Sequence, residues 1–134
     1  MTRRGLQIIL TLLGSVALVA GVLSVLFGVY LIPDHGDVNP SVDSEMRFFA
    51  VWYAGAGLVV LRVVPRVEAA RQTIRAVAAA FFIAGCSRLI SIIVAGNPHA
   101  LFLVLMAIEL VLPLVIVPWQ TSIARPNVRD RTSV

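Results

Sequence analysis

The stretch IRAVAAAFFIAGCSRLISIIVAGNPHALFLVLMAIELVLPLVIVPW, residues 74–119, decides the fold of this chain. It contains two apolar segments, 74–95 and 100–119. Each is close to the roughly 20 residues that a membrane-spanning helix needs. Only the turn 96–99 separates them, and its Asn and Pro favour a reversal of the chain. The stretch therefore predicts two membrane-spanning helices in an antiparallel hairpin.

One arginine and one glutamate interrupt this apolar hairpin. Arg88 lies seven residues before Ala95, and Glu109 lies nine residues after Ala100. At about 1.5 Å of rise per residue, both side chains are expected roughly 10 to 14 Å below the outer surface. An unpaired arginine at that depth is costly. The sequence therefore predicts a direct ion pair between Arg88 and Glu109.

The composition of the whole chain is that of a membrane protein. Apolar residues make up 59%, charged residues only 13%, and the mean hydropathy is +0.94. Two further apolar segments, 6–32 and 48–64, precede the hairpin. We expect an all-α fold in which residues 1–124 form one domain, an antiparallel bundle of four spans running up-down-up-down. A flexible basic tail, residues 125–134, is expected to follow in the cytoplasm.

Arginines are distributed unevenly around these segments. Nine flank the ends expected on one side, whereas Arg47 alone flanks the other: Arg3, Arg4, Arg62, Arg66, Arg71, Arg75, Arg125, Arg129 and Arg131. The positive-inside rule then places both termini in the cytoplasm and the chain in the cytoplasmic (inner, plasma) membrane. Residues 33–45 are expected to form a solvated acidic loop outside, with Tyr30, Trp52 and Tyr53 near the outer interface.

Small residues recur at steps of three or four along the first segment. Gly14, Gly21 and Gly28, together with Ala17 and Ser24, form one smooth stripe. Such stripes allow close approach of another membrane helix. Two partners remain open from the sequence: another span of the same chain, or the same stripe of a second copy in a homodimer.

The expected ion pair has two interpretations, a structural clamp or a polar pocket. In the pocket interpretation Ser87 and Ser91 would join Arg88 and Glu109, and Arg47 would lie at the outer mouth. The ligand would be a lipid, a small amphiphile or a helix of a membrane-protein partner. Pro113 would leave the Glu109 carbonyl without its helical partner, because proline has no N–H.

Several function classes lack their motifs in this sequence. It has no G-x-x-x-x-G-K-[ST], G-x-S-x-G or H-E-x-x-H motif. One cysteine and two histidines also give no basis for a metal site, a cofactor or a disulfide. Because the arginines flank helices, nucleic-acid binding is not expected. We expect a binding or accessory module and no enzyme. The alternative is a dimeric proton-coupled transporter with Glu109 as proton carrier.

A family resemblance follows from these residues. The run 85–91 (GCSRLIS), the turn Gly96-Asn97-Pro98, and the later Glu109 and Pro113 resemble a widespread bacterial family of small four-helix membrane proteins. Arg47 and the run 55–58 (GAGL) are similar as well. This family is known only as domain of unknown function 4345, and the resemblance covers roughly residues 6 to 120. It implies a four-helix membrane fold but no activity, substrate or cofactor.

Overall fold

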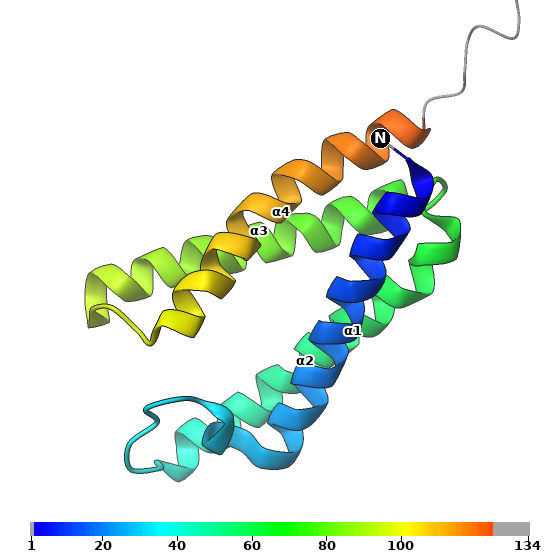
Figure 1. Ribbon diagram of the computed structural model, residues 1–134. Coiled ribbons are helices and arrows are strands. Elements are labelled where there is room, and N and C mark those ends of the chain that lie inside the picture. The colour runs from blue at the N-terminus through cyan, green and yellow to red at the C-terminus, as the bar shows by residue number, and fades with distance from the viewer. Residues whose placement is uncertain (1, 125–134) are drawn as a thin grey trace, which may run out of the picture.

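Four long α-helices make up the fold in a computed structural model that describes residues 2–124 (Figure 1). They are α1 (Arg3–Phe27), α2 (Pro40–Val63), α3 (Arg71–Ala95) and α4 (Ala100–Ala124), with 3-10 turns η1 (Gly28–Leu31) and η2 (Val64–Arg66). No strand occurs within the described residues. All four helices are long and apolar enough to cross a membrane, as expected of a multi-pass membrane protein. The tail predicted at 125–134 lies outside the described residues.

The second helix begins earlier than the sequence pattern indicated. Its first residue is Pro40, so the segment expected to be loop up to Glu45 is helical from Pro40 onward. The local signals for this start are strong. Asn39 accepts a hydrogen bond from the Ser41 amide, and Pro40 occupies the first turn, where its missing N–H costs nothing. The prediction that residues 33–45 form a loop was therefore wrong for its second half.

Helices α1 and α2 pack through their small residues. A Cβ atom on Gly14 would lie 3.1 Å from the Gly57 carbonyl oxygen, and one on Gly57 would lie 2.5 Å from the Leu18 amide nitrogen. Further along, a Cβ atom on Gly21 would lie 2.5 Å from the Ala54 nitrogen. Positions later in α1 therefore face positions earlier in α2, and the two helices form a hairpin. The small-residue stripe of α1 is used inside the chain.

Helices α3 and α4 form the second hairpin. Gly85 faces α4 closely, because a Cβ atom there would lie 2.9 Å from Leu110 Cγ and 3.2 Å from Glu109 Cβ. Helix α4 continues through Pro113 and Pro118 to Ala124, five residues beyond the end predicted at Trp119. Prolines are tolerated within membrane helices where neighbouring groups compensate for the lost backbone bond.

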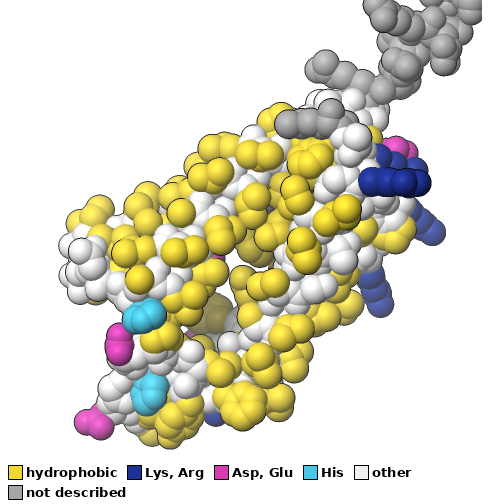
Figure 2. Space-filling view, in the orientation of Figure 1, with side chains coloured by type: hydrophobic (Ala, Val, Ile, Leu, Met, Phe, Trp, Pro, Cys, Tyr) yellow, Lys and Arg dark blue, Asp and Glu magenta, His cyan; other side chains and the backbone are white. Residues whose placement is uncertain are grey.

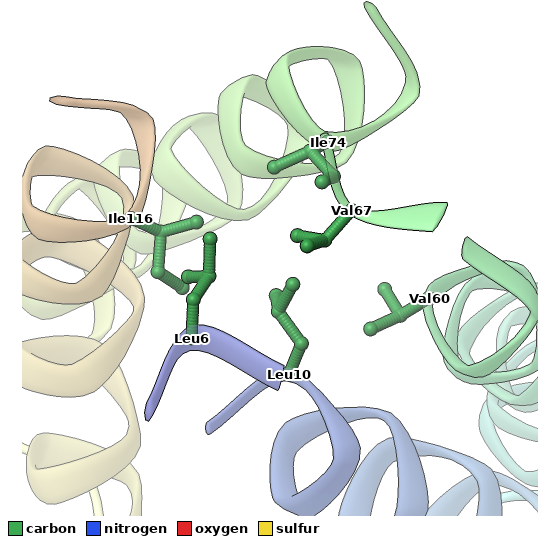
Figure 3. Packing of buried hydrophobic residues seen from close by; sticks show 6 residues of the cluster. All are labelled: Leu6, Leu10, Val60, Val67, Ile74 and Ile116. Carbon is green, nitrogen blue, oxygen red and sulfur yellow. The ribbon is translucent and has the colours of Figure 1, made fainter. Parts of the chain in front are cut away.

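The two hairpins meet near one end of the molecule and diverge toward the other (Figure 1). An apolar cluster joins them where the chain begins and where η2 leads into α3 (Figure 3). It draws side chains from every helix and from the α2–α3 connection: Leu6, Leu10, Val60, Val67, Ile74 and Ile116. Beyond this cluster the molecular surface is hollowed between the hairpins (Figure 2). The bundle is thus tight at one end and open at the other.

Charged side chains separate along the same axis. In the view of Figure 2, the arginines gather at the end near the start of α1, whereas the histidines and most acidic side chains in view gather at the opposite end. Membrane-spanning helices commonly carry their charged residues near the ends and few in the middle, and this distribution matches that pattern. The open side of the bundle therefore lies toward the acidic end.

Candidate functional site

Arg88 and Glu109 form a bidentate ion pair between α3 and α4. Arg88 Nε donates to Glu109 Oε2 at 2.7 Å, and Arg88 Nη2 donates to Glu109 Oε1 at 3.1 Å. The Glu109 side chain is 6% exposed, whereas that of Arg88 is 35% exposed. The guanidinium carbon also lies 5.7 Å from the centre of the Phe102 ring, within the range of a cation–π contact. A bidentate pair of this type stabilises the contact and also fixes the relative orientation of the two side chains.

The neighbouring backbone explains how the pair forms. Gly85 precedes Arg88 by three residues and lets α4 approach α3 closely at the level of Glu109. Four residues after Glu109, Pro113 carries no N–H, so the Glu109 carbonyl lacks its usual partner in the helix. Glu109 therefore lies where α3 and α4 approach closely and where the α4 helix lacks one backbone hydrogen bond.

Ser87 and Ser91 do not join the pair. Ser87 is exposed, and its hydroxyl donates to the Ala84 carbonyl of its own helix at 2.7 Å. Ser91 is also exposed, and no hydrogen bond joins it to Arg88 among the described residues. Ser87, one residue away, is rotated by about 100° from Arg88, whereas Ser91, three residues away, lies on a neighbouring part of the surface and still forms no hydrogen bond with it. Contrary to the expectation from the sequence, neither serine accepts a hydrogen bond from the Arg88 guanidinium.

Arg47 lies away from the Arg88–Glu109 pair and binds the end of α1. Its Nη1 donates to the Val25 and Leu26 carbonyls, at 2.6 and 3.0 Å, and its Nε donates to Asp43 Oδ2 at 2.7 Å. The last carbonyls of a helix have no partner within the helix. Arg47 supplies one for α1, so its contacts tie α2 to α1 and none reaches the Arg88–Glu109 pair.

Asp43 completes this contact, which we call the α1–α2 clasp: Asp43, Arg47, Gly28 and Val29. Asp43 Oδ1 accepts a hydrogen bond from the Val29 amide at 2.9 Å. Gly28 has φ +58°, and a Cβ there would overlap the Asp43 carboxylate and Arg47 guanidinium. Asp43 lies in the first turn of α2, ahead of the apolar segment 48–64. There the Arg47 hydrogen bond, then that of Val29, lowers the pKa of the Asp43 carboxyl.

Sequence reasoning treated Asp43 as part of a solvated loop and missed the α1–α2 clasp. One signal was available. Asp43 and Arg47 are four residues apart, the spacing at which opposite charges pair on a helix surface. It becomes informative only once the helix is known to start at Pro40. Gly28 was predicted to be a packing residue. The structure shows why a glycine is needed there: φ is positive, and a Cβ atom would overlap Arg47.

An apolar cavity of about 60 Å³ lies between the two hairpins. It is lined from all four helices, including Leu10, Ala17, Gly57, Val60, Phe81 and Pro113. Phe81 also contacts Tyr53 of α2, with ring centres 6.1 Å apart. Tyr53 lies six residues beyond Arg47, about 9 Å further along α2. Through its contact with Phe81 it faces the inside of the bundle.

The cavity and the ion pair share one side of the α3–α4 hairpin. Phe81 and Arg88 are seven residues apart, nearly two full turns, so they occupy the same face of α3. On α4, Ile108 and Pro113 line the cavity on either side of Glu109 in sequence. An apolar space and a polar pair therefore adjoin in the opening between the hairpins.

The closed end of the bundle holds a second polar network, which the sequence did not suggest. Carbonyl groups of the α2–α3 connection accept hydrogen bonds from Gln7 (to Val64, 3.0 Å) and from the fully buried Gln120 (to Val67, 3.2 Å). Buried backbone groups need such partners. These contacts attach α1 and α4 to the connection between the hairpins.

No metal centre is indicated in the part of the chain that the structure describes. Residues 2–124 contain no group of three His, Cys, Asp or Glu side chains that could hold an ion. Cys86 is a free thiol on α3, partly exposed. The chemistry that the described site offers is thus hydrogen bonding and charge, next to an apolar surface.

Comparison with known proteins gives one family. Searches of the curated proteins and of the solved structures give no match to this chain. A family model, described as "Domain of unknown function (DUF4345)", matches residues 5–120, which include all of the site residues above. By this match the chain belongs to the DUF4345 family of domains of unknown function.

Proposed function

We propose that this protein is a membrane-embedded binding module, without enzymatic activity, that holds an amphiphilic molecule in the opening between its hairpins. The observation that carries the proposal is the incomplete burial of Arg88. Its side chain is held in place by Glu109 and yet is 35% exposed, and it shares a face of α3 with Phe81, which lines the apolar cavity. A polar group beside an apolar space is the usual composition of a small-molecule site.

The membrane setting strengthens this argument. An ion pair at this depth costs desolvation energy, and buried pairs are weak sources of stability. Where ionisable residues occur within membrane spans, they commonly mark a functional site. A clamp alone would be served best by a fully covered arginine. The partial exposure of the Arg88 side chain is therefore consistent with a ligand.

The proposal includes a topology. Both termini would lie in the cytoplasm, and the four helices would cross the cytoplasmic membrane in the order up-down-up-down. Support comes from the arginine asymmetry and from the charge separation seen in Figure 2. In this orientation the hairpins diverge toward the outer leaflet. The lipid bilayer itself then supplies amphiphiles to the opening.

Native mass spectrometry in a gentle detergent tests the proposal. The wild-type protein should retain an amphiphile, and Arg88→Met should retain clearly less. Arg62→Met is the matched control, because Arg62 is exposed near the end of α2. The proposal fails if the wild type carries no amphiphile under these conditions. It also fails if the Arg88 and Arg62 variants retain equal amounts.

Proton-coupled transport by a dimer, with Glu109 as carrier, is the competing function. In reconstituted vesicles it would appear as a proton flux that Glu109→Gln abolishes and Glu45→Gln leaves intact. Glu45 is exposed near the start of α2, so its replacement changes net charge equally. Retention of an amphiphile without such a flux favours the binding module.

A further inference from the structure

We infer that the head group of the bound amphiphile is uncharged and accepts hydrogen bonds, as the carbonyl oxygen of an ester or a quinone does. This inference rests on the proposed function and adds the chemical class of the ligand. It depends on the charge balance of the Arg88–Glu109 pair, on the hydrogen-bond donors that the pair leaves over, and on the position of the apolar cavity.

Charge balance argues against an ionic head group. The positive charge of Arg88 is offset by Glu109 through two hydrogen bonds, of 2.7 and 3.1 Å. Within residues 2–124 no further ion pair involves either side chain. An anionic head group would place a second negative charge beside the Glu109 carboxylate, and a cationic one would repel Arg88. Neither charge would be compensated in an apolar setting, where that is costly.

The unused N–H donors of Arg88 favour a head group that accepts hydrogen bonds. A guanidinium carries five N–H donors, and Glu109 uses one on Nε and one on Nη2. Two donors on Nη1 and one on Nη2 remain, and no described residue accepts a hydrogen bond from them. Arg88 has no acceptor to offer, so a head group that only donates would gain nothing there. A carbonyl oxygen, with two lone pairs, matches these donors.

The tail of the ligand has an apolar path next to this head group. Phe81, which lines the cavity, lies about 10 Å along α3 from Arg88. A head group at Arg88 therefore places the following carbon chain along Phe81 and into the space between the hairpins. Tyr53 of α2 contacts Phe81 next to this path.

Three probes with the same hexadecyl-length chain separate the head-group classes: methyl hexadecanoate (neutral acceptor), hexadecyl sulfate (anionic) and hexadecyltrimethylammonium (cationic). Binding to the delipidated protein is measured by native mass spectrometry at equal mole fractions in detergent. We expect the ester to bind about tenfold more tightly than either ion, a difference of roughly 1.4 kcal/mol. A short-chain quinone provides a fourth arm that distinguishes ester from quinone carbonyls.

Glu109→Gln gives the sharpest test because it removes the compensating charge. The variant should bind hexadecyl sulfate more tightly than the ester, whereas the matched Glu45→Gln should keep the wild-type order. If the wild type binds hexadecyl sulfate as well as the ester, the inference fails and the binding module stands. If none of the probes binds although the wild type retains a native amphiphile, the inference fails and the binding module stands. If the wild type retains no amphiphile and binds no probe, the proposed function itself fails. Should Glu109→Gln not fold, the wild-type order of the probes decides alone.

Discussion

Gly21 of α1 lies so close to Ala54 of α2 that a Cβ atom on Gly21 would stand 2.5 Å from the Ala54 backbone nitrogen. The same atom would lie 2.8 Å from the Ala50 carbonyl oxygen. Backbone atoms cannot move aside as a flexible side chain can. Close approach of this kind stabilises membrane helix pairs through dispersion contacts, since lipid offers no hydrophobic drive for their association.

Gly21→Ala should therefore destabilise the α1–α2 hairpin by about 1–3 kcal/mol, the usual cost of overfilling a packed site. Gly55→Ala is the matched control, because a Cβ atom at Gly55 would meet nothing within 4 Å. Thermal unfolding in detergent, followed by circular dichroism, measures both. Equal melting temperatures for the two variants would mean that the contact at Gly21 is not close.

Removal of Glu109 should cost more than removal of both members of the ion pair. Glu109→Gln leaves the Arg88 charge without a partner. Breaking a buried pair costs about 3–5 kcal/mol, and we expect the lower end because Arg88 is 35% exposed. The double variant Arg88→Met with Glu109→Gln should recover part of this loss. A double-mutant cycle from denaturant titrations measures the coupling, and additive effects would contradict a direct interaction.

The α1–α2 clasp predicts a dependence of stability on pH. The pKa of Asp43 in the folded protein lies below its usual value of 3.8, through Arg47 and Val29. The stabilisation is therefore fully present above about pH 4 and is lost as the pH falls through the lowered pKa. Melting temperatures measured from pH 7 downward should drop in this acidic window. Asp43→Asn should be less stable at neutral pH and should show a smaller drop; an unchanged drop would assign it to other carboxylates.

Reporter fusions test the proposed topology. A reporter that is active only in the cytoplasm should be active when fused after Val134 and inactive when inserted at Gly36. Gly36 lies in the exposed α1–α2 loop, where a Cβ atom would meet nothing within 4 Å. Because α1 and α2 each have the length to cross a bilayer, the loop and the termini are expected on opposite sides. Activity at both sites would exclude the four-span arrangement.

A good part of this structure could be predicted from local pattern. The four apolar helices follow from segment length and composition, which are sums over neighbouring residues and need no knowledge of packing. The contact of Arg88 with Glu109 follows from similar depth in adjacent spans, together with the cost of leaving either charge alone. The start of α2 at Pro40 was not predicted, but its signals, the Asn39 cap and the proline, are present in the sequence.

What the sequence by itself determined is therefore which four segments are apolar helices and that Arg88 and Glu109 pair between two of them. Only the tertiary structure decided which face each helix turns to its neighbours. It directed Ser87 outward, gave Arg47 to the carbonyls of α1, turned Tyr53 inward to Phe81 and left the hairpins open at one end. The physical reason is that these helices are apolar on every side. In lipid, an apolar residue can face either the bilayer or another helix, so the pattern of apolar residues does not predict which face is buried. The orientation of each helix is instead set by the fit of small residues and by a few polar contacts between distant segments.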